Sequence, residues 1–326
     1  MGTKRLRLRK NRYILDVEPK KETVMARHVP KLEDLLAGAQ LPALPQSAIR
    51  LLELSQDPDN GPAEFAVPIE GDPGLTGQVL RFVNSSYFGF SREISSVKLA
   101  ITLVGIRTIK NFSLWSAVFS LMPNPRCGPF DLKSLWQDSL RRALFARSMG
   151  KNFSLAEAED LFAAGLLQDM AVPLLVKELP EQYARLFDTR AREGRRLSEL
   201  ETEAFGWNHA QASGLMARMW SLPDHFISLL EGHIDWQSQL QQPELPLGHL
   251  AVSLSALLPS AVDGDWQERD LFVASYQKAV RGNLQNIGEV LQEVDKGFEE
   301  FAPLLKLSQP STSLYEHLFP ETATAS

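Results

Sequence analysis

The residues best suited to chemistry lie in the segment Gly-Leu-Leu-Gln-Asp-Met-Ala at 165–171, where a carboxamide, Gln168, precedes a carboxylate, Asp169. A neutral imidazole nitrogen is a strong donor to a divalent transition metal, whereas the carbonyl oxygen of glutamine is a weak one. The pair therefore offers one good metal-binding group and one poor one. Asp169 also falls near the C-terminal end of an expected helix, where a carboxylate is disfavoured by the helix dipole. We expect it to have a partner, for which a hydrogen bond from His209 is a candidate.

Other potentially reactive residues have simpler roles. Ser85, Ser86, Ser95 and Ser96 could suggest a nucleophile, but no Gly-x-Ser-x-Gly segment surrounds them, and capping or turn formation explains them. Cys127 is the single cysteine, so an internal disulfide is ruled out and a reducing cytosol is expected. The sequence contains no Gly-x-x-x-x-Gly-Lys-Ser/Thr loop, so nucleotide hydrolysis lacks its usual phosphate-binding apparatus.

The elements that would position these residues are helices. Asp72-Pro73 marks a helix start, Ser96 an N-cap and Gly105 a helix stop. Ser154 to Glu157 and Asn208 to Gln211 have the spacing of capping boxes. Apolar spacing and these signals predict an all-α, multi-helix bundle with helices at 45–54, 61–70, 72–84, 97–104, 106–122, 132–149, 155–170, 180–193, 197–204, 209–220, 223–233, 247–258, 266–281 and 284–306.

Charge is distributed unevenly along the chain. Residues 1–28 hold nine Lys/Arg against three Asp/Glu, a net charge of +6. The whole chain has a net charge of −6, so residues 29–326 carry −12. We expect 1–28 to be a flexible basic arm, with contact to nucleic acid or anionic lipid as alternatives. The acidic body argues against nucleic acid as its main partner. The sequence contains no run of about 18 apolar residues, so we expect no membrane span. Its first residues contain no apolar segment of the kind found in secretory signals, so we expect no such signal.

Residues 41–107 contain a series of short motifs in a specific order and spacing, and the likeness continues through Trp136, 164–169 and 205–210 to cover roughly residues 35–235. Together they resemble the HDOD domain, a bacterial relative of the metal-dependent HD phosphohydrolases that has mostly lost the metal site. The motif positions include Asn84, Ser85, Tyr87, Gly89 and Gly105. The motifs themselves are Leu41-Pro42-Ala43-Leu44-Pro45, Asp72-Pro73-Gly74-Leu75-Thr76, Arg81-Phe82-Val83-Asn84-Ser85-Ser86-Tyr87-Phe88-Gly89 and the segment from Ile94 to Gly105.

The resemblance implies where a metal site would be. The first histidine of the HD pattern falls at Asp138 and the second at Gln168, while Asp169, His209 and His233 keep metal-binding side chains. We therefore interpret these five positions as a degenerate site with no catalytic residue, no metal and no cofactor. Hydrogen bonding and helical pairing, such as Asp138 with Arg141 and Arg142 one turn later, can account for them without an ion.

These observations predict a cytoplasmic, non-catalytic signalling module that binds a partner protein. A residual metal-dependent phosphohydrolase is one alternative, and a sensor of a nucleotide second messenger that reuses the metal cavity is another. We expect an HDOD domain over 29–235, with a helical subdomain at 29–122 and a degenerate HD-like subdomain at 132–235. Helices at 236–307 would complete the domain, and 308–326 would be a frayed tail apart from a turn at Leu314–Leu318.

Overall fold

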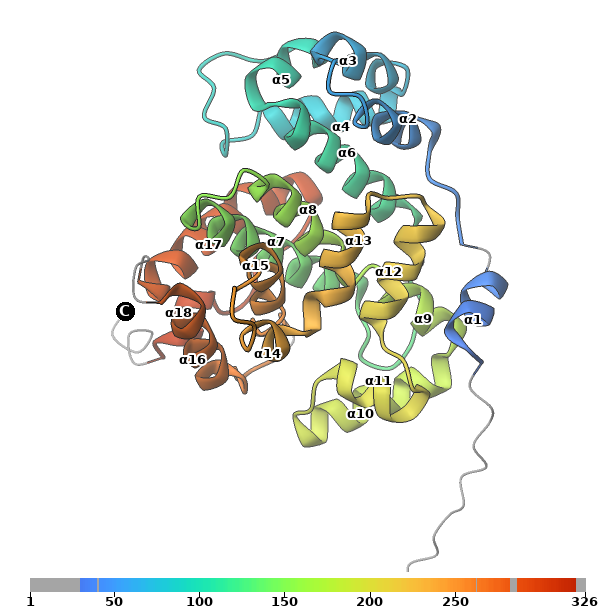
Figure 1. The fold of residues 1–326 in the computed structure, drawn as a ribbon, viewed down its shortest axis with the longest axis vertical. Coiled ribbons are helices and arrows are strands. Elements are labelled where there is room, and N and C mark those ends of the chain that lie inside the picture. The colour runs from blue at the N-terminus through green and yellow to red at the C-terminus, as the bar shows by residue number, and fades with distance from the viewer. Residues whose placement is uncertain (1–29, 40, 262, 282–285, 321–326) are drawn as a thin grey trace, which may run out of the picture. The chain divides into compact units, whose positions relative to one another are not determined.

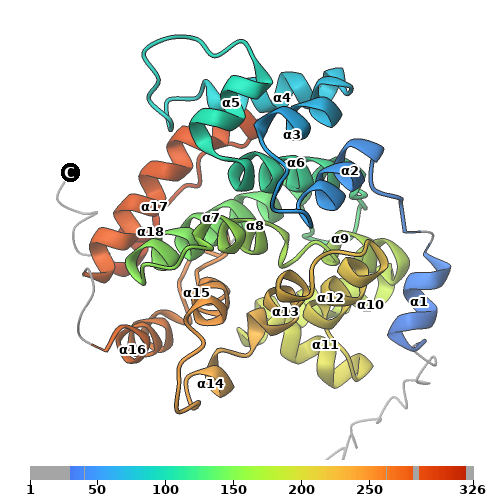
Figure 2. The same cartoon turned by 45° about the horizontal axis from the view of Figure 1, so that its top comes forward.

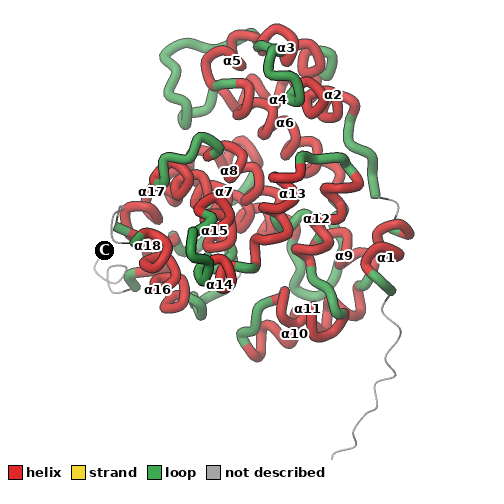
Figure 3. Tube along the Cα trace, viewed as in Figure 1, coloured by secondary structure: helices red, strands yellow, loops and turns green. Residues whose placement is uncertain are grey.

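The computed structural model describes residues 30–39, 41–261, 263–281 and 286–320, and the regular elements within these ranges are all helices (Figure 1, Figure 3). The predicted all-α fold is confirmed. The basic arm at 1–28 lies outside the described residues. Within the described part of the chain, no helix combines the length and the apolar character needed to cross a bilayer.

The helices follow the chain in three groups. Those before residue 122 are α1 (Leu32–Gly38), α2 (Gln46–Leu54), α3 (Pro62–Glu70), α4 (Pro73–Val83), α5 (Val97–Val104) and α6 (Ile106–Leu121). Those from 132 to 234 are α7 (Leu132–Asn152), α8 (Ala158–Leu167), α9 (Val172–Glu178), α10 (Pro180–Glu193), α11 (Leu197–Phe205), α12 (His209–Met219), α13 (Asp224–Glu231) and the 3-10 helix η1 (Gly232–Ile234). The remainder are α14 (Trp236–Gln239), α15 (Leu247–Ser255), α16 (Arg269–Val280), α17 (Ile287–Phe301), the 3-10 helix η2 (Ala302–Leu305) and α18 (Leu314–Leu318).

Helix α7 is the centre of the packing. It lies against α8 along its length, and α15 and α17 from the C-terminal part of the chain also pack on it (Figure 2). Most of its residues are buried, including polar ones such as Asp138 and Arg141. Helices α2 to α6 pack on one another, and α6 connects this group to α8. A residue on α7 can therefore meet side chains from several distant parts of the sequence.

The contact between α7 and α8 depends on a glycine. A Cβ added to Gly165 of α8 would lie 2.6 Å from the Cα of Ala143 and 2.9 Å from its backbone nitrogen. Real Cβ atoms do not approach backbone this closely, so only glycine allows the two helices to come this near. Since Gly165 precedes Asp169 by one helical turn, the same contact brings Asp169 close to α7.

Several local signals in the sequence are confirmed. Asp72 caps α4 and Ser96 caps α5, each by accepting a hydrogen bond from a backbone N–H in the first turn. Asn208 caps α12 and exchanges reciprocal hydrogen bonds with Gln211. Gly105 ends α5 with a φ of 93°, a conformation that favours glycine.

The motif residues after α4 hold the loop that leads to α5. The Asn84 side chain accepts a hydrogen bond from the backbone N–H of Ile94 and donates to its carbonyl oxygen, at 2.7 and 2.8 Å. Ser85 donates to the carbonyl of Phe82, and Gly89 turns the chain with a φ of 62°. The Tyr87 ring packs against Phe301, with ring centroids 4.2 Å apart. These contacts give the motif positions structural roles.

The structure bears on two expectations for individual segments. The capping box at Ser154 to Glu157 is wrong, because Ser154 adopts a left-handed φ of 57° and its N–H bonds back to the last turn of α7. Helix α8 begins only at Ala158, with no side-chain cap. We expect the tail from Ser308 to be frayed apart from a turn at Leu314–Leu318, and that turn is a helix, α18, whose Leu314 and Leu318 are buried and which packs on α17. The two carboxylate oxygens of Asp295 accept hydrogen bonds from the first backbone N–H groups of α18.

Replacement of Gly165 by alanine tests the α7–α8 contact. We expect Gly165→Ala to lower the free energy of unfolding by about 1–3 kcal/mol, because the added methyl group meets backbone atoms that cannot move independently. Urea denaturation measures this loss. Gly38→Ala in α1 is the control, since no atom lies within 4 Å of its added Cβ and its stability should match the wild type. Equal stability of the two variants would contradict the close approach.

Candidate functional site

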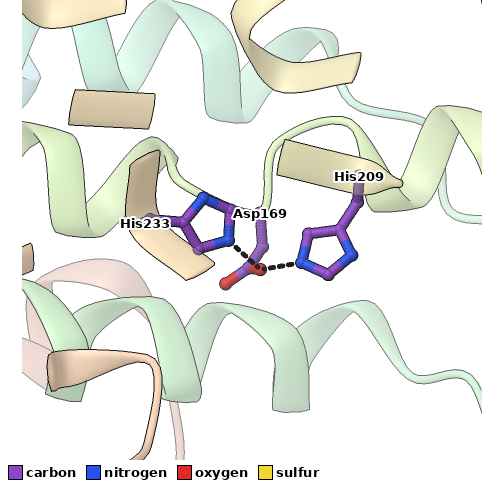
Figure 4. Close-up of side chains that lie close together, drawn as sticks. All are labelled: Asp169, His209 and His233. Atoms are coloured by element: carbon purple, nitrogen blue, oxygen red, sulfur yellow. Dashed lines mark ion pairs between the residues drawn. The ribbon is translucent and has the colours of Figure 1, made fainter. Parts of the chain in front are cut away.

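Asp169, His209 and His233 converge on one point in the structure (Figure 4). Asp169 lies in the turn between α8 and α9, His209 is the first residue of α12 and His233 is in η1. The Nε2 atoms of His209 and His233 lie 3.4 and 3.7 Å from the same Asp169 oxygen, Oδ1. The structure thus brings together the three metal-binding side chains that the sequence retains. The expected pairing of Asp169 with His209 is present as an ion-pair contact.

Each histidine has a fixed orientation because its other ring nitrogen is engaged. The Nδ1–H of His233 donates to the carbonyl oxygen of Leu230 at 2.6 Å, which leaves a lone pair on Nε2 directed at Asp169. His209 is placed by the Asn208 cap of α12, and its Nδ1 lies 2.6 Å from Oε2 of Glu201. Both imidazoles therefore present Nε2 to the carboxylate.

Glu201 and Tyr183 form a second layer behind His209. Glu201, fully buried on α11, accepts hydrogen bonds from the backbone N–H of His209 at 2.8 Å and from the Tyr183 hydroxyl at 2.7 Å. Neither residue was predicted. The structure places Glu201 on the buried face of α11, three residues after the buried Ser198 and next to the buried Leu200. A buried carboxylate held by three donors positions the imidazole that it contacts.

The other oxygen of Asp169 is occupied by Arg142. The guanidinium Nη1 of this α7 residue donates a hydrogen bond to Asp169 Oδ2 and forms an ion pair with it. The side chains of Arg142 and Asp169 are only 15% and 6% exposed. Sequence reasoning paired Arg142 with Asp138 along the helix and missed this longer-range contact. Little solvent screens the pair, so its charges interact strongly.

The two substituted positions have protein partners of their own. Asp138 accepts hydrogen bonds from the Ser260 hydroxyl and the Ala261 backbone N–H, both at 2.6 Å. The fully buried Gln168 accepts a hydrogen bond from Ser255 at 3.3 Å, and its Nε2 has no hydrogen-bond partner among the described residues. These side chains thus serve the packing of α7 and α8 on the segment around α15.

The environment sets the protonation states of the cluster. Burial opposes ionisation of Asp169, but Arg142 and the two histidines outweigh it and lower its pKa to about 2. Burial lowers the pKa of His233 to about 3, despite the attraction of Asp169. For His209, burial is outweighed by Glu201 and Asp169, so its pKa is raised. At neutral pH, Asp169 is a carboxylate and His233 a neutral imidazole.

The donor set permits a limited metal chemistry. Two imidazole nitrogens and one carboxylate oxygen, all within 4.8 Å of one another, are ligand types that suit a divalent transition metal. These three ligand groups alone do not make up the larger set of ligands in the HD-type site that the resemblance implies. Asp138 and Gln168 bond to protein groups, and the Arg142 guanidinium lies against the remaining Asp169 oxygen.

A cavity of about 540 Å³ opens beside the cluster. Its lining includes Asp138, Arg142 and Asp169, together with both histidines. Aromatic and arginine side chains also line it, among them Phe130, Phe187, Trp266, Arg190 and Arg196. Arg190 forms a bidentate pair with Asp263, at 2.9 and 2.6 Å. The size and mixed lining are typical of a small-molecule site.

The low pKa of His233 predicts a measurable pH dependence. Below pH 6.5 the unfolded chain protonates this histidine while the folded chain does not, so the wild type loses stability as pH falls toward 3. From pH 7 to pH 5 this single group contributes a loss of about 2 kcal/mol. We expect the free energy of unfolding of His233→Gln, measured by urea denaturation, to fall by about 2 kcal/mol less than that of the wild type between pH 7 and pH 5. Ring NMR of the wild type should show His233 still neutral at pH 5.

The matched control is His225→Gln, because the His225 side chain is 59% exposed. It should keep the wild-type dependence of stability on pH. A His233 ring that titrates between pH 6 and 7 would refute the buried, neutral assignment.

Comparison with solved structures places this fold among known proteins. An HDOD domain protein of unknown function from Geobacter sulfurreducens has a TM-score of 0.67 at 20% identity, over 85% of this chain and 97% of that one. A protein of Shewanella amazonensis described as a candidate phosphohydrolase has a TM-score of 0.60 at 21% identity, over 87% and 97%. A candidate signal transduction protein of Marinobacter aquaeolei has a TM-score of 0.58 at 17% identity, over 84% and 63%. At these identities the likeness establishes the fold.

Sequence comparison identifies the family. The chain spans only 37% and 28% of the lengths of two curated relatives that it matches, both uncharacterised proteins. The model of the HDOD domain matches residues 41–235, which is more than half of the chain and includes α2 to α13 as well as Asp169, His209 and His233. The family predicted from the motifs at 41–107 is therefore confirmed, and this chain belongs to the HDOD domain family.

Proposed function

We propose that this protein is a non-catalytic regulatory module that acts in signal transduction by binding a partner protein. The observation that carries the proposal is that the side chains at the two substituted positions, Asp138 and Gln168, form hydrogen bonds with other protein groups. Asp138 accepts hydrogen bonds from Ser260 and Ala261, Gln168 accepts one from Ser255, and Arg142 pairs with Asp169. A hydrolytic metal centre needs open coordination positions for water and substrate. The HDOD family and the Marinobacter relative's description as a signalling protein support a regulatory role.

An activity assay tests the non-catalytic part of the proposal. We expect purified protein with added Mn²⁺ to release no product from mononucleotides, cyclic mononucleotides or cyclic dinucleotides, as followed by chromatography. Asp169→Asn is the companion variant, because it removes the carboxylate shared by the cluster. Turnover by the wild type that this variant loses would favour the alternative, a residual phosphohydrolase that uses Asp138, Asp169, His209 and His233.

The proposal assigns partner binding to the helices of residues 41–122, with the 132–235 half stabilising or gating that surface and 236–307 completing the domain. Leu99 and Leu103 of α5 are 45% and 47% exposed and lie one turn apart on the same face of the helix. Val67 of α3, the helix that packs on α5, is 68% exposed. Apolar side chains exposed on neighbouring helices are typical of protein-binding surfaces.

The double variant Leu99→Glu/Leu103→Glu tests this assignment. Two added charges should weaken capture of the partner at least about tenfold, because each must be desolvated at the interface. Affinity capture followed by mass spectrometry compares it with the wild type. Leu271→Glu on α16 is the control, since Leu271 is similarly exposed at 41% but lies outside residues 41–122. A partner lost equally from both variants would contradict the assignment to α5.

The cavity favours a second candidate function, a sensor for a nucleotide-type ligand. Phe130, Phe187 and Trp266 carry rings on which a base could stack. Arg190 and Arg196 carry guanidinium groups that a phosphate would share with Asp263 and Glu268. A ligand at 100 times its dissociation constant would stabilise the fold by about 2.7 kcal/mol, which a thermal-shift screen detects. A flat screen across cyclic nucleotides and dinucleotides would count against this candidate.

A further inference from the structure

We propose that Arg142 is a built-in cation that replaces a divalent metal at Asp169, and that removing its charge would turn the Asp169–His209–His233 cluster into a metal-binding site. The inference goes beyond the proposed function, because it assigns a role to a residue outside the family motifs. Three side chains of types that bind metals, Asp169, His209 and His233, converge, but the two substituted positions of the HD-type site bond to protein groups. In addition, the guanidinium of Arg142 contacts the carboxylate that an ion would bind.

Asp169 is a buried carboxylate that needs a partner for its charge. A nearby positive charge favours the ionised form, and a metal ion commonly supplies it. Here the guanidinium of Arg142 supplies it through a direct contact with Oδ2. Arg142 lies one helical turn after Asp138 on α7, so its charge is also close to that second buried carboxylate. One fixed cation thus lies close to two buried acidic side chains, although burial raises the pKa of Asp138.

Both histidines hold Nε2 toward Asp169, and a metal ion would take the place of any proton on Nε2 of His209. His233 donates from Nδ1 to Leu230, so its Nε2 carries the lone pair, and that atom has no hydrogen-bond partner among the described residues. It lies 3.7 Å from Oδ1 of Asp169, so two electron-pair donors face each other, and a cation between them would bind both. Behind His209 lies Glu201, and a carboxylate that holds the far nitrogen is the usual support of a metal-bound imidazole.

Arg142 would exclude an ion from the cluster electrostatically. An ion bound to Asp169 Oδ1 and to both Nε2 atoms would lie within a few ångströms of the Arg142 guanidinium, which contacts the other oxygen of the same carboxylate. Both charges are positive, and the surroundings are shielded from solvent. Their repulsion would lower metal affinity steeply, so Arg142 and a divalent ion are mutually exclusive at this carboxylate.

The test is metal binding by variants that separate charge from shape. Arg142→Met removes the charge but keeps a long side chain, and we expect it to bind one Zn²⁺ or Mn²⁺ per chain at least about 100-fold more tightly than the wild type. Equilibrium dialysis with elemental analysis measures both ions. Arg142→Lys keeps the charge and should behave as the wild type. Arg142→Met/His233→Gln should lose the gained affinity, because it lacks one ligand.

Arg190→Met is the matched control. Arg190 lines the same cavity and pairs with an aspartate, Asp263, but lies outside the histidine cluster, so its removal should create no metal site. If Arg142→Met does not fold alone, recovery of its fold on refolding with Zn²⁺, and not with Mg²⁺, supports the proposal.

Three results would overturn it. They are stoichiometric Zn²⁺ or Mn²⁺ in the wild type, a folded Arg142→Met variant with wild-type affinity, and an unfolded one that metal does not rescue. These outcomes are distinct from failure of the proposed function. Catalytic turnover by the wild type would end the non-catalytic assignment, whereas a metal-free Arg142→Met variant would end only the inference about Arg142.

Discussion

The approach of α8 to α7 at Gly165 is the constraint on which the site depends. With no side chain at that position, α8 lies close enough to α7 for the following turn to bring Asp169 against Arg142. Helix α7 is also the surface on which α15 and α17 pack, so it joins the middle of the chain to its C-terminal part. The position of one carboxylate is therefore set by backbone packing, and the histidines of α12 and η1 meet it there.

Charge balance explains why this buried polar cluster is stable. Asp169, Asp138 and Glu201 are buried acids, and each has hydrogen-bond donors that stabilise its charged form. Arg142 compensates two of them, and Glu201 favours a proton on His209. A buried charge without such a partner would be costly, whereas a paired and hydrogen-bonded one is tolerated. The acidic groups of the cluster thus have partners within the protein, whereas Nε2 of His233 has no hydrogen-bond partner among the described residues.

The sequence predicted what depends on local chemistry. Asp72, Ser96 and Asn208 cap helices as their types and spacing indicate, because a cap involves residues only two or three positions apart. Asp169, His209 and His233 were singled out only through the family resemblance, and the structure shows that they converge. Arg142 was assigned to Asp138 because helical spacing reveals neighbours on one helix, whereas its true contact is 27 residues away and follows from packing. The predicted box at Ser154 failed because that residue already terminates the preceding helix.

The hydrogen bonds around Glu201 have a consequence for how the molecule folds. Tyr183 of α10, Glu201 of α11 and His209 of α12 meet only when three successive helices have docked, and Asp169 adds a contact from α8. Until all are in place, at least one acid is dehydrated without its compensating donor. Partly assembled states are thereby penalised, which makes unfolding of this half cooperative. The acidic groups around Glu201 would then favour the complete structure over states in which one of these helices has not yet docked.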